Sequence, residues 1–216
     1  MTLDPIAPAV TAYLDALVPT RPRELQAMEA EAAHTGFPII GPAAGHLCYL
    51  LTRLMGAHTV FELGSGFGYS TAWFARGVAE NGGGRVYHTV WDQALSDRAR
   101  RHLGALGLDS MVHYHVGEAV GALREAVGPF DIIFNDIDKT GYPDALPVIR
   151  EKLRPGGLLI ADNLLWHGRI FDPEDRSAET LGVKAFTEMV AQDTRWTAAI
   201  VPIRDGLLVA RLDDRA

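Results

Sequence analysis

Apolar residues recur at helical spacing through the first 57 positions of the chain. The spacing of three to four residues is that of one face of an α-helix. Prolines at positions 19, 22, 38 and 42 separate the repeats, where they do not interrupt a helical hydrogen-bond ladder. The pattern predicts three helices in an N-terminal extension, residues 1–57, and their apolar positions are Ile6, Val10, Tyr13, Leu14 and Leu17, then Leu25 and Met28, then Leu47, Leu50, Leu51 and Leu54.

From residue 59 onward, short β-branched runs alternate with longer helical stretches. This alternation predicts an α/β fold with a mostly parallel sheet covered on both faces. A late helix precedes two strands whose short connection predicts antiparallel pairing. We therefore expect a single domain, residues 1–216, with an α/β core over 58–216. The expected strands are 59–63, 85–90, 111–116, 131–136, 158–162, 196–203 and 206–212, and the expected helices are 69–80, 93–106, 119–127, 142–153 and 179–192.

Composition and charge narrow the class of protein. Hydrophobic residues make up 48% of the 216 residues and charged residues 22%, which is typical of a globular protein. The formal net charge is −7, which disfavours general binding to nucleic acid. The single cysteine, Cys48, lies in an apolar run and is predicted to be a core residue. One cysteine forms no intrachain disulfide, and no run of 18 apolar residues occurs, so we expect a cytoplasmic protein without a membrane span.

A glycine-rich turn follows the first predicted strand, in the segment ELGSGFGYS at 62–70. Glycines at a strand-to-helix turn let a ligand approach the backbone, and the helix N-terminus offers free N–H groups to a negative group. The dinucleotide fingerprint requires Gly or Ala at position 69, and Tyr69 is neither, which argues against NAD. The turn therefore predicts a cofactor site of a different kind.

Oxygen-bearing side chains follow two later strands. Asp136 and Lys139 end the segment FNDIDK at 134–139, and Asp162 and Asn163 follow the next strand. Ligands of open parallel sheets bind outside the carboxyl ends of the strands, so these side chains are expected at the same crevice as the glycine turn. Carboxylate and amide oxygens suit Mg²⁺ or Ca²⁺ better than zinc. The alternative interpretation is that these residues only cap turns and helices.

Other polar residues carry weaker signals. His113 and His115 alternate along a predicted strand and could hold a metal, but a polar sheet face or core histidines explain them more simply. His167 lies near the predicted site as a substrate contact or a plain loop residue. Ser70 has no histidine partner at a recognisable spacing, so serine hydrolase chemistry has no support.

Together these segments resemble the cation-dependent, S-adenosylmethionine-dependent O-methyltransferases, the family of caffeoyl-CoA and catechol O-methyltransferases. The resemblance covers nearly the whole chain. The paired segments D-x-D-K and D-N-x-x-W-x-G are specific, whereas the glycine turn alone is not. The matching segments are IGPAAGHL at 40–47, FELGSGFGYS at 61–70, GEA at 117–119, FDIIFNDIDK at 130–139 with Tyr142, the Gly156 and Gly157 pair, DNLLWHG at 162–168 and PIRDG at 202–206.

The resemblance implies a Rossmann-like methyltransferase fold, with a seven-stranded sheet and an antiparallel last strand. It implies S-adenosylmethionine and a divalent cation, Mg²⁺ or another such as Ca²⁺ or Mn²⁺, as cofactors. A cation beside the acceptor hydroxyl would favour its ionised form, which a lysine can assist as base. By position, the cofactor contacts are Ile40, Glu62, Gly64, Ser65, Ser70, Ala119 and Asp136, the metal ligands are Asp136, Asp162 and Asn163, and the catalytic residues are Lys139 and Asp136.

One position departs from the family pattern. Members usually end the second strand with an acidic residue that holds the ribose hydroxyls, and Val90 stands there in this chain. This is the ungapped alignment of the strand. A gapped alignment is also possible, because the turn at 81–84 varies easily in length, and Asp92 lies two residues after Val90. Trp91 is expected to cover the adenine face. The ribose contact is therefore the part of the cofactor site that the sequence leaves open.

Three functions remain in competition. The leading interpretation is a metal-dependent O-methyltransferase of a small hydroxylated aromatic or natural-product acceptor, active as a homodimer as family members commonly are. The second is a methyltransferase of tRNA nucleosides, for which Arg98, Arg100 and Arg101 form a candidate basic patch. The third is a cofactor-binding protein without catalysis, supported only by Val90.

Overall fold

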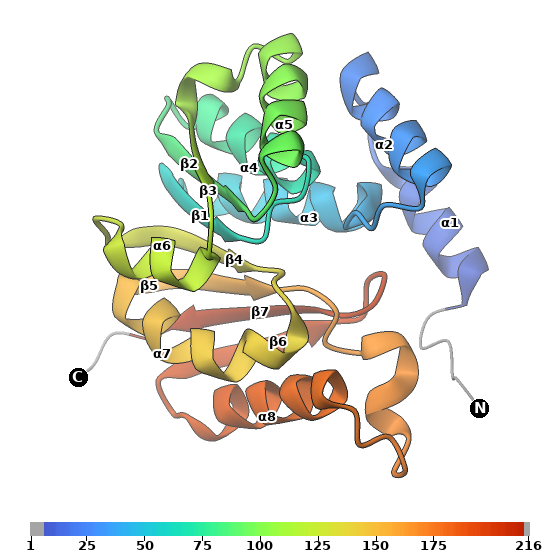
Figure 1. Ribbon diagram of the computed structural model, residues 1–216, viewed down its shortest axis with the longest axis vertical. Coiled ribbons are helices and arrows are strands. Elements are labelled where there is room, and N and C mark those ends of the chain that lie inside the picture. The colour runs from blue at the N-terminus through green and yellow to red at the C-terminus, as the bar shows by residue number, and fades with distance from the viewer. Residues whose placement is uncertain (1–6, 214–216) are drawn as a thin grey trace.

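The computed structural model describes residues 7–213, and a seven-stranded sheet runs through its centre (Figure 1). The strand order is β3-β2-β1-β4-β5-β7-β6. Strand β7 pairs antiparallel with both of its neighbours, and all other pairs are parallel. The predicted Rossmann-like sheet with an antiparallel last strand is confirmed. The strands are β1 (Thr59–Leu63), β2 (Arg85–Val90), β3 (Val112–Val116), β4 (Phe130–Asn135), β5 (Leu153–Ala161), β6 (Trp196–Val201) and β7 (Leu207–Leu212).

Three helices precede the first strand, as the apolar spacing predicts. They are α1 (Pro8–Leu17), α2 (Arg23–Thr35) and α3 (Gly41–Leu54). Ile6, which belongs to the first predicted repeat, lies outside the described residues. Cys48 on α3 is fully buried, which confirms its assignment to the core. Helix α3 packs closely on α4 (Tyr69–Glu80). Gly45 permits this approach, since a Cβ there would lie 2.3 Å from the Trp73 indole.

Helices cover both faces of the sheet, and each face has its own apolar core. Helices α2, α3, α4 and α5 (Gln93–Ala105) pack on one face, where Trp73 and Phe74 are fully buried. Helices α6 (Ala119–Glu125), α7 (Tyr142–Lys152) and α8 (Ala178–Gln192) cover the other, where Phe61 and Phe186 are buried (Figure 1). The two layers leave the carboxyl ends of the parallel strands free to form a site.

Strand β5 begins earlier than the prediction of 158–162. Pro155 and the glycine pair after it argue against a strand, because proline lacks a donor and glycine weakens a ladder. Phe130 of β4 lies opposite Leu153, but Ile132, two residues later, lies opposite Leu158. The extra residues of β5, Pro155 and the glycine pair among them, therefore form an irregular bulge. No helix among residues 7–213 combines the length and apolar character needed to cross a membrane.

Candidate active site

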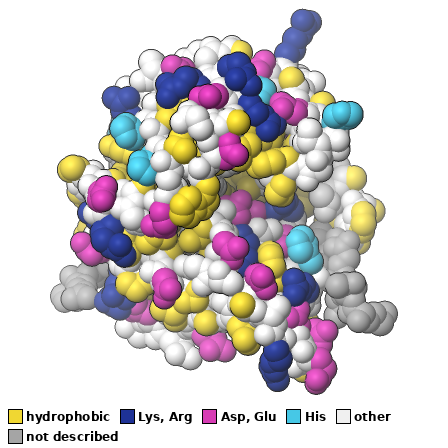
Figure 2. Space-filling model, in the orientation of Figure 1, with side chains coloured by type: hydrophobic (Ala, Val, Ile, Leu, Met, Phe, Trp, Pro, Cys, Tyr) yellow, Lys and Arg dark blue, Asp and Glu magenta, His cyan; other side chains and the backbone are white. Residues whose placement is uncertain are grey.

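A pocket of about 580 Å³ opens at the carboxyl ends of β1, β4 and β5. The viewed face of the molecule is hollowed near its centre, and acidic and basic side chains lie together in that hollow (Figure 2). The pocket contains all three predicted metal ligands and the predicted base. Its lining residues are Phe37, Pro38, Ile39, Gly64, Gly66, Asp136, Ile137, Asp138, Lys139, Asp162, Asn163, Trp166, His167, Glu179 and Arg204.

The glycine turn lies directly against the end of β4. Gly64 has a φ of 83°, and a Cβ at this position would lie 2.4 Å from the backbone oxygen of Asp136. The Asp136 amide donates to the Leu63 carbonyl at 2.8 Å. Only glycine permits this approach, which brings the predicted cofactor turn beside the first predicted metal ligand.

Glu62 is a fully buried carboxylate beside that turn. Neither of its oxygens completes a hydrogen bond of ordinary geometry within the described residues. Burial raises the pKa of Glu62 to about 7, and the nearby hydroxyls of Ser70, Thr71 and Ser65 only partly offset this. An unpaired buried carboxylate is suited to a positive group from a ligand, such as the ammonium of S-adenosylmethionine.

A second, smaller pocket of about 30 Å³ adjoins the first. It brings together five of the predicted cofactor residues, which are Ile40, Gly64, Ser65, Ser70 and Asp136. Of the other three, Glu62 is the buried carboxylate beside the turn, and the remaining two positions lie elsewhere. Ala119 is buried at the start of α6, and Trp91 follows β2 with 72% of its surface exposed, so neither lines these two pockets.

The structure assigns Asp92 a local role. Its carboxylate accepts hydrogen bonds from the amides of Ala94 and Leu95, at 2.6 and 3.3 Å, and so caps the N-terminus of α5. Val90 is the last residue of β2 and is 7% exposed, as the ungapped alignment of this strand predicts. An apolar side chain therefore lies at the end of β2, where the resemblance places the usual acidic residue.

The ammonium group of Lys139 connects the segment after β4 to the first residue of α7. Nζ donates to Asp136 Oδ1 at 2.8 Å, to the Ile137 carbonyl at 3.2 Å and to the Tyr142 hydroxyl at 2.9 Å. The buried Tyr142 hydroxyl in turn lies 3.0 Å from the Asn135 carbonyl and 2.9 Å from the Asp162 carbonyl. Tyr142 thus holds the predicted base between the two strand ends that carry the predicted ligands.

Asp162 and Asn163 are held by the turn between β6 and β7. Arg204 Nη1 lies 2.5 Å from Asp162 Oδ2, and Asn163 Nδ2 donates to Asp205 Oδ2 at 3.0 Å. Asp162 Oδ1 is buried and has no hydrogen-bond partner among residues 7–213. Burial raises the pKa of Asp162, and the Arg204 guanidinium opposes that shift.

These groups fit a hard divalent cation. Among residues 7–213, no three His, Cys, Asp or Glu side chains gather in an arrangement that could hold a metal ion. The candidate set combines two carboxylates with an amide instead, and Mg²⁺ commonly takes few protein oxygens and completes its shell with water. Oδ1 of Asp162, which has no hydrogen-bond partner among the described residues, is the oxygen that such a cation would bind.

Sequence reasoning missed the part played by Arg204 and Asp205. The segment PIRDG at 202–206 matches the family and predicts a tight connection between strands, but this pattern assigns no role to its two charged residues. Asp205 is 4% exposed, and its Oδ1 also accepts a hydrogen bond from the His167 amide at 2.7 Å. A charged pair within a short turn beside the last parallel strand is the signal that could have identified them.

The weaker candidates lie apart from the pocket or are paired. His113 and His115 line a separate pocket of about 200 Å³, together with residues of β2 and α6. Arg98 pairs with Glu31 at 2.5 Å, and Arg100 lies 3.9 Å from Asp109. His167 does line the main pocket, and its side chain is 65% exposed.

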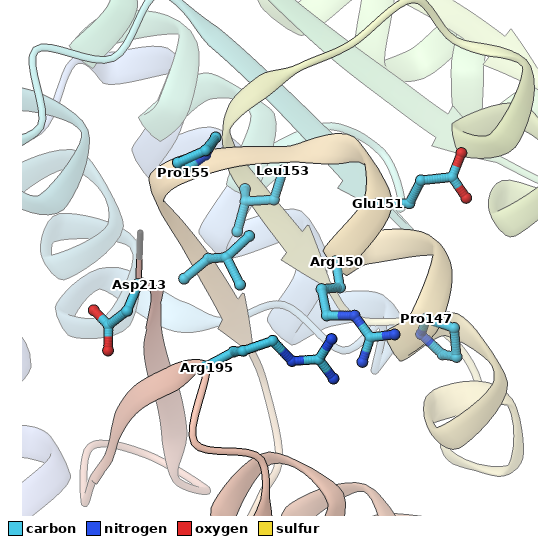
Figure 3. Close-up of a pocket in the computed structure, with 8 residues that line it drawn as sticks. Pro147, Arg150, Glu151, Leu153, Pro155, Arg195 and Asp213 are labelled. Carbon is cyan, nitrogen blue, oxygen red and sulfur yellow. The ribbon is translucent and has the colours of Figure 1, made fainter. Parts of the chain in front are cut away.

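A further pocket, of about 810 Å³, lies at the opposite end of the sheet. Leu153 at the start of β5 and Leu212 at the end of β7 mark its position. The guanidinium groups of Arg150 and Arg195 lie side by side there (Figure 3), and both pair with Asp193. None of the predicted site residues lines this pocket.

Comparisons with known proteins agree with this geometry. The sequence model of the O-methyltransferase family matches residues 21–212. The chain is 32% identical over 199 residues to a catechol O-methyltransferase of Niastella koreensis, which covers 89% of each chain. It is 33% identical over 185 residues to a protein of Mycobacterium tuberculosis named a probable O-methyltransferase, covering 84% of this chain and 81% of that one.

Solved structures lead to the same family. The O-methyltransferase TomG of Streptomyces achromogenes, in complex with S-adenosylmethionine, superposes with a TM-score of 0.85 at 28% identity, over 95% of this chain and 96% of TomG. An O-methyltransferase of Bacillus cereus bound to S-adenosylhomocysteine gives the same score and identity, over 95% of this chain and 97% of that protein. Given this match and the unpaired Glu62 beside the glycine turn, the chain belongs to the O-methyltransferase family and is an S-adenosylmethionine-dependent enzyme.

Proposed function

We propose that this enzyme is a divalent-metal-dependent O-methyltransferase that methylates a hydroxyl of a small aromatic, catechol-like or natural-product acceptor. The observation that carries the proposal is the set of oxygen donors at the ends of β4 and β5. Asp136, Asp162 and Asn163 line one pocket beside the cofactor turn, and Asp162 Oδ1 has no hydrogen-bond partner within the described part of the chain. Mg²⁺, Mn²⁺ and Ca²⁺ are the cations that such donors prefer.

The walls of the pocket suit a small aromatic acceptor. Phe37, Ile39 and Trp166 provide apolar and aromatic surface, and the exposed His167 also lines the pocket. The volume of about 580 Å³ is in the range of small-molecule sites. The catechol O-methyltransferase of Niastella koreensis, a relative at 32% identity, supports an acceptor of this class.

The chain supplies the groups that the transfer needs. A phenolic hydroxyl has a pKa near 10 in water, and a divalent cation supplies charge that favours its ionisation. Lys139 is the proposed base; Nζ accepts the proton of the acceptor hydroxyl only as the neutral amine, so its ammonium form must first release a proton to solvent, and its contacts with Asp136, Ile137 and Tyr142 hold it in position. The fixed turn at Gly64 and the pocket walls hold methyl donor and acceptor together, and proximity accounts for much of the rate.

Methyl transfer from labelled S-adenosylmethionine tests this function. We expect product with catechols in the presence of Mg²⁺ and loss of turnover in EDTA, restored by added Mg²⁺. Activity that survives EDTA undiminished would refute the metal part of the proposal. Asp136→Ala should remove both cation binding and turnover, whereas Lys139→Ala should keep cation binding and slow the chemical step by roughly 10²- to 10⁴-fold.

Two alternatives are tested in the same assay. Bulk tRNA in place of catechol reports nucleoside methylation, which the ion pairs of Arg98 and Arg100 make less favourable because both compete with phosphate contacts. Absence of product from every acceptor, with S-adenosylmethionine still bound, would favour a protein without catalysis.

A homodimer and a cytoplasmic location complete the proposal. Exposed apolar side chains on α1 and α3 support a dimer, among them Val10, Tyr13, Leu17, Leu50 and Leu54. Light scattering that gives a mass near 23.5 kDa at micromolar concentration would contradict it. The single buried cysteine supports a reducing compartment.

A further inference from the structure

Arg204 reaches the buried carboxylate of Asp162 from a different element of the fold. It lies in the turn between β6 and β7 with a φ of 51°, and its Nη1 is 2.5 Å from Asp162 Oδ2. The Asp162 side chain is 2% exposed and that of Arg204 is 27% exposed. We propose that Arg204 is a resident cation that shares the Asp162 carboxylate and weakens the binding of the divalent metal ion there. This inference rests on the proposed metal site.

Each of the two predicted carboxylate ligands has a cationic side chain beside it. Lys139 pairs with Asp136 at 2.8 Å, and Arg204 pairs with Asp162, so each carboxylate has one cationic partner. A buried charge without a partner is strongly destabilising, so the guanidinium stabilises the site before a metal ion binds. A divalent ion at the same carboxylate would be a second cation beside the guanidinium.

The two oxygens of Asp162 differ in a way that fits this competition. Oδ2 accepts from Arg204, whereas Oδ1 is buried without a partner. An ion on Oδ1 would share a single carboxylate with the guanidinium, at a separation of a few ångströms. Like charges this close repel, and the repulsion is weakly screened in a partly buried pocket. The guanidinium therefore lowers the affinity of the ion.

The local structure keeps Arg204 in place but leaves its side chain room to adjust. The Gly206 amide donates to the Ile203 carbonyl at 2.9 Å, and the Leu164 amide donates to the Gly206 carbonyl at 2.9 Å. The backbone of the turn is thus tied to the segment after β5. The Arg204 side chain lines the open pocket, where Glu179 offers a further carboxylate to a displaced guanidinium.

Titration with Mn²⁺, followed by electron paramagnetic resonance of the free ion, tests the inference without an activity measurement. Arg204→Gln should bind Mn²⁺ at least about tenfold more tightly than the wild-type protein, whereas Arg204→Lys, which keeps the charge, should stay within a few-fold of it. Arg195→Gln is the matched control, because Arg195 pairs with Asp193 outside the metal pocket. This control should leave Mn²⁺ affinity unchanged.

Thermal unfolding provides a second readout. In EDTA, Arg204→Gln should unfold at a lower temperature than the wild type, because Asp162 loses its partner, and Mn²⁺ should raise that temperature more than it does for the wild type. Equal or weaker Mn²⁺ binding by Arg204→Gln, with the wild type still binding, would overturn the inference and leave the proposed function intact. If neither protein binds Mn²⁺, the metal site itself is wrong and the inference falls with it. Binding by the variant alone would support the inference.

Discussion

Glu62 and His88 stand opposite each other in register on strands β1 and β2, and both side chains are fully buried. Thr71 on α4 connects them, because its hydroxyl lies 3.1 Å from His88 Nδ1 and close to the Glu62 carboxylate. Burial raises the pKa of Glu62 to about 7 and lowers that of His88 to about 3. His88 is therefore neutral above about pH 3, and Glu62 keeps its proton only below about pH 7.

The raised pKa of Glu62 predicts a pH-dependent affinity for the cofactor. Below pH 7 the carboxyl is protonated and must lose its proton before it pairs with the ammonium of the ligand. We expect the Kd for S-adenosylhomocysteine to weaken by up to about tenfold per pH unit below 7. Calorimetry from pH 5.5 to 8.5 measures this, and Glu62→Gln should bind weakly without the same slope. A wild-type affinity that is constant over this range would contradict the prediction.

The two buried groups also predict opposite effects of pH on stability. His88 is neutral in the native state, and the unfolded chain takes up its proton below pH 6.5, so this residue destabilises the fold as pH falls toward 3. Glu62 holds a proton in the native state up to about pH 7, so it stabilises the fold as pH falls from 7 to 4.5. Between pH 4.5 and 6.5 the two contributions oppose each other.

Urea unfolding of two variants separates these contributions. Relative to the wild type, Glu62→Gln should gain stability as pH rises from 4.5 to 7, by an amount on the order of 3 kcal/mol. His88→Gln should instead gain relative stability as pH falls from 6.5. Other titrating groups occur in all three proteins and cancel in the differences. Parallel stability curves for wild type and variants would show that burial does not shift these pKa values.

Because Val90 stands where a ribose-binding carboxylate is expected, an acidic substitution there should raise the affinity for S-adenosylmethionine. A carboxylate that accepts from two ribose hydroxyls makes charge-assisted hydrogen bonds, and valine makes none. Val90→Asp should therefore tighten S-adenosylmethionine by about tenfold or more, measured by calorimetry. Val90→Asn is the control without charge and should gain less.

Asp92 provides the complementary test of the same strand. Because it caps α5, Asp92→Ala should cost about 1 kcal/mol of stability and leave cofactor affinity nearly unchanged. A strong loss of affinity in Asp92→Ala, together with no effect of Val90→Asp, would make Asp92 the ribose ligand.

Substitution of Gly64 by alanine should destabilise the protein through a steric clash, and Gly36 provides a glycine for comparison. Gly36 and Gly64 both have positive φ values, of 70° and 83°, but only at Gly64 would a Cβ meet the backbone, 2.4 Å from the Asp136 oxygen. Gly36→Ala should cost about 1 to 2 kcal/mol, the cost of left-handed backbone for alanine. Gly64→Ala should cost clearly more and weaken cofactor binding, measured by urea unfolding and calorimetry. Equal costs would contradict the close approach of β1 and β4.

The sequence predicted the sheet and the edge at which the site lies. Strand and helical periodicities differ, so the alternation after residue 59 reveals parallel strands without any knowledge of contacts. The carboxyl ends of those strands meet at one edge, which is why Asp136, Asp162 and the turn at Gly64 could be placed together. The start of β5 escaped prediction, because a bulge admits Pro155 to a strand that local rules would end.

The sequence by itself therefore determined the chemistry available at this edge, because backbone periodicity and the types of residue after each strand are local properties. Only the tertiary structure decided how those groups are paired. The contacts of Asp162 with Arg204 and of Asn163 with Asp205 each join residues 42 positions apart. Such contacts depend on the antiparallel return of β7 and on side-chain conformations, and no local pattern encodes either. The same holds for Glu62 and His88, whose shifted pKa values arise from burial between two layers of helices.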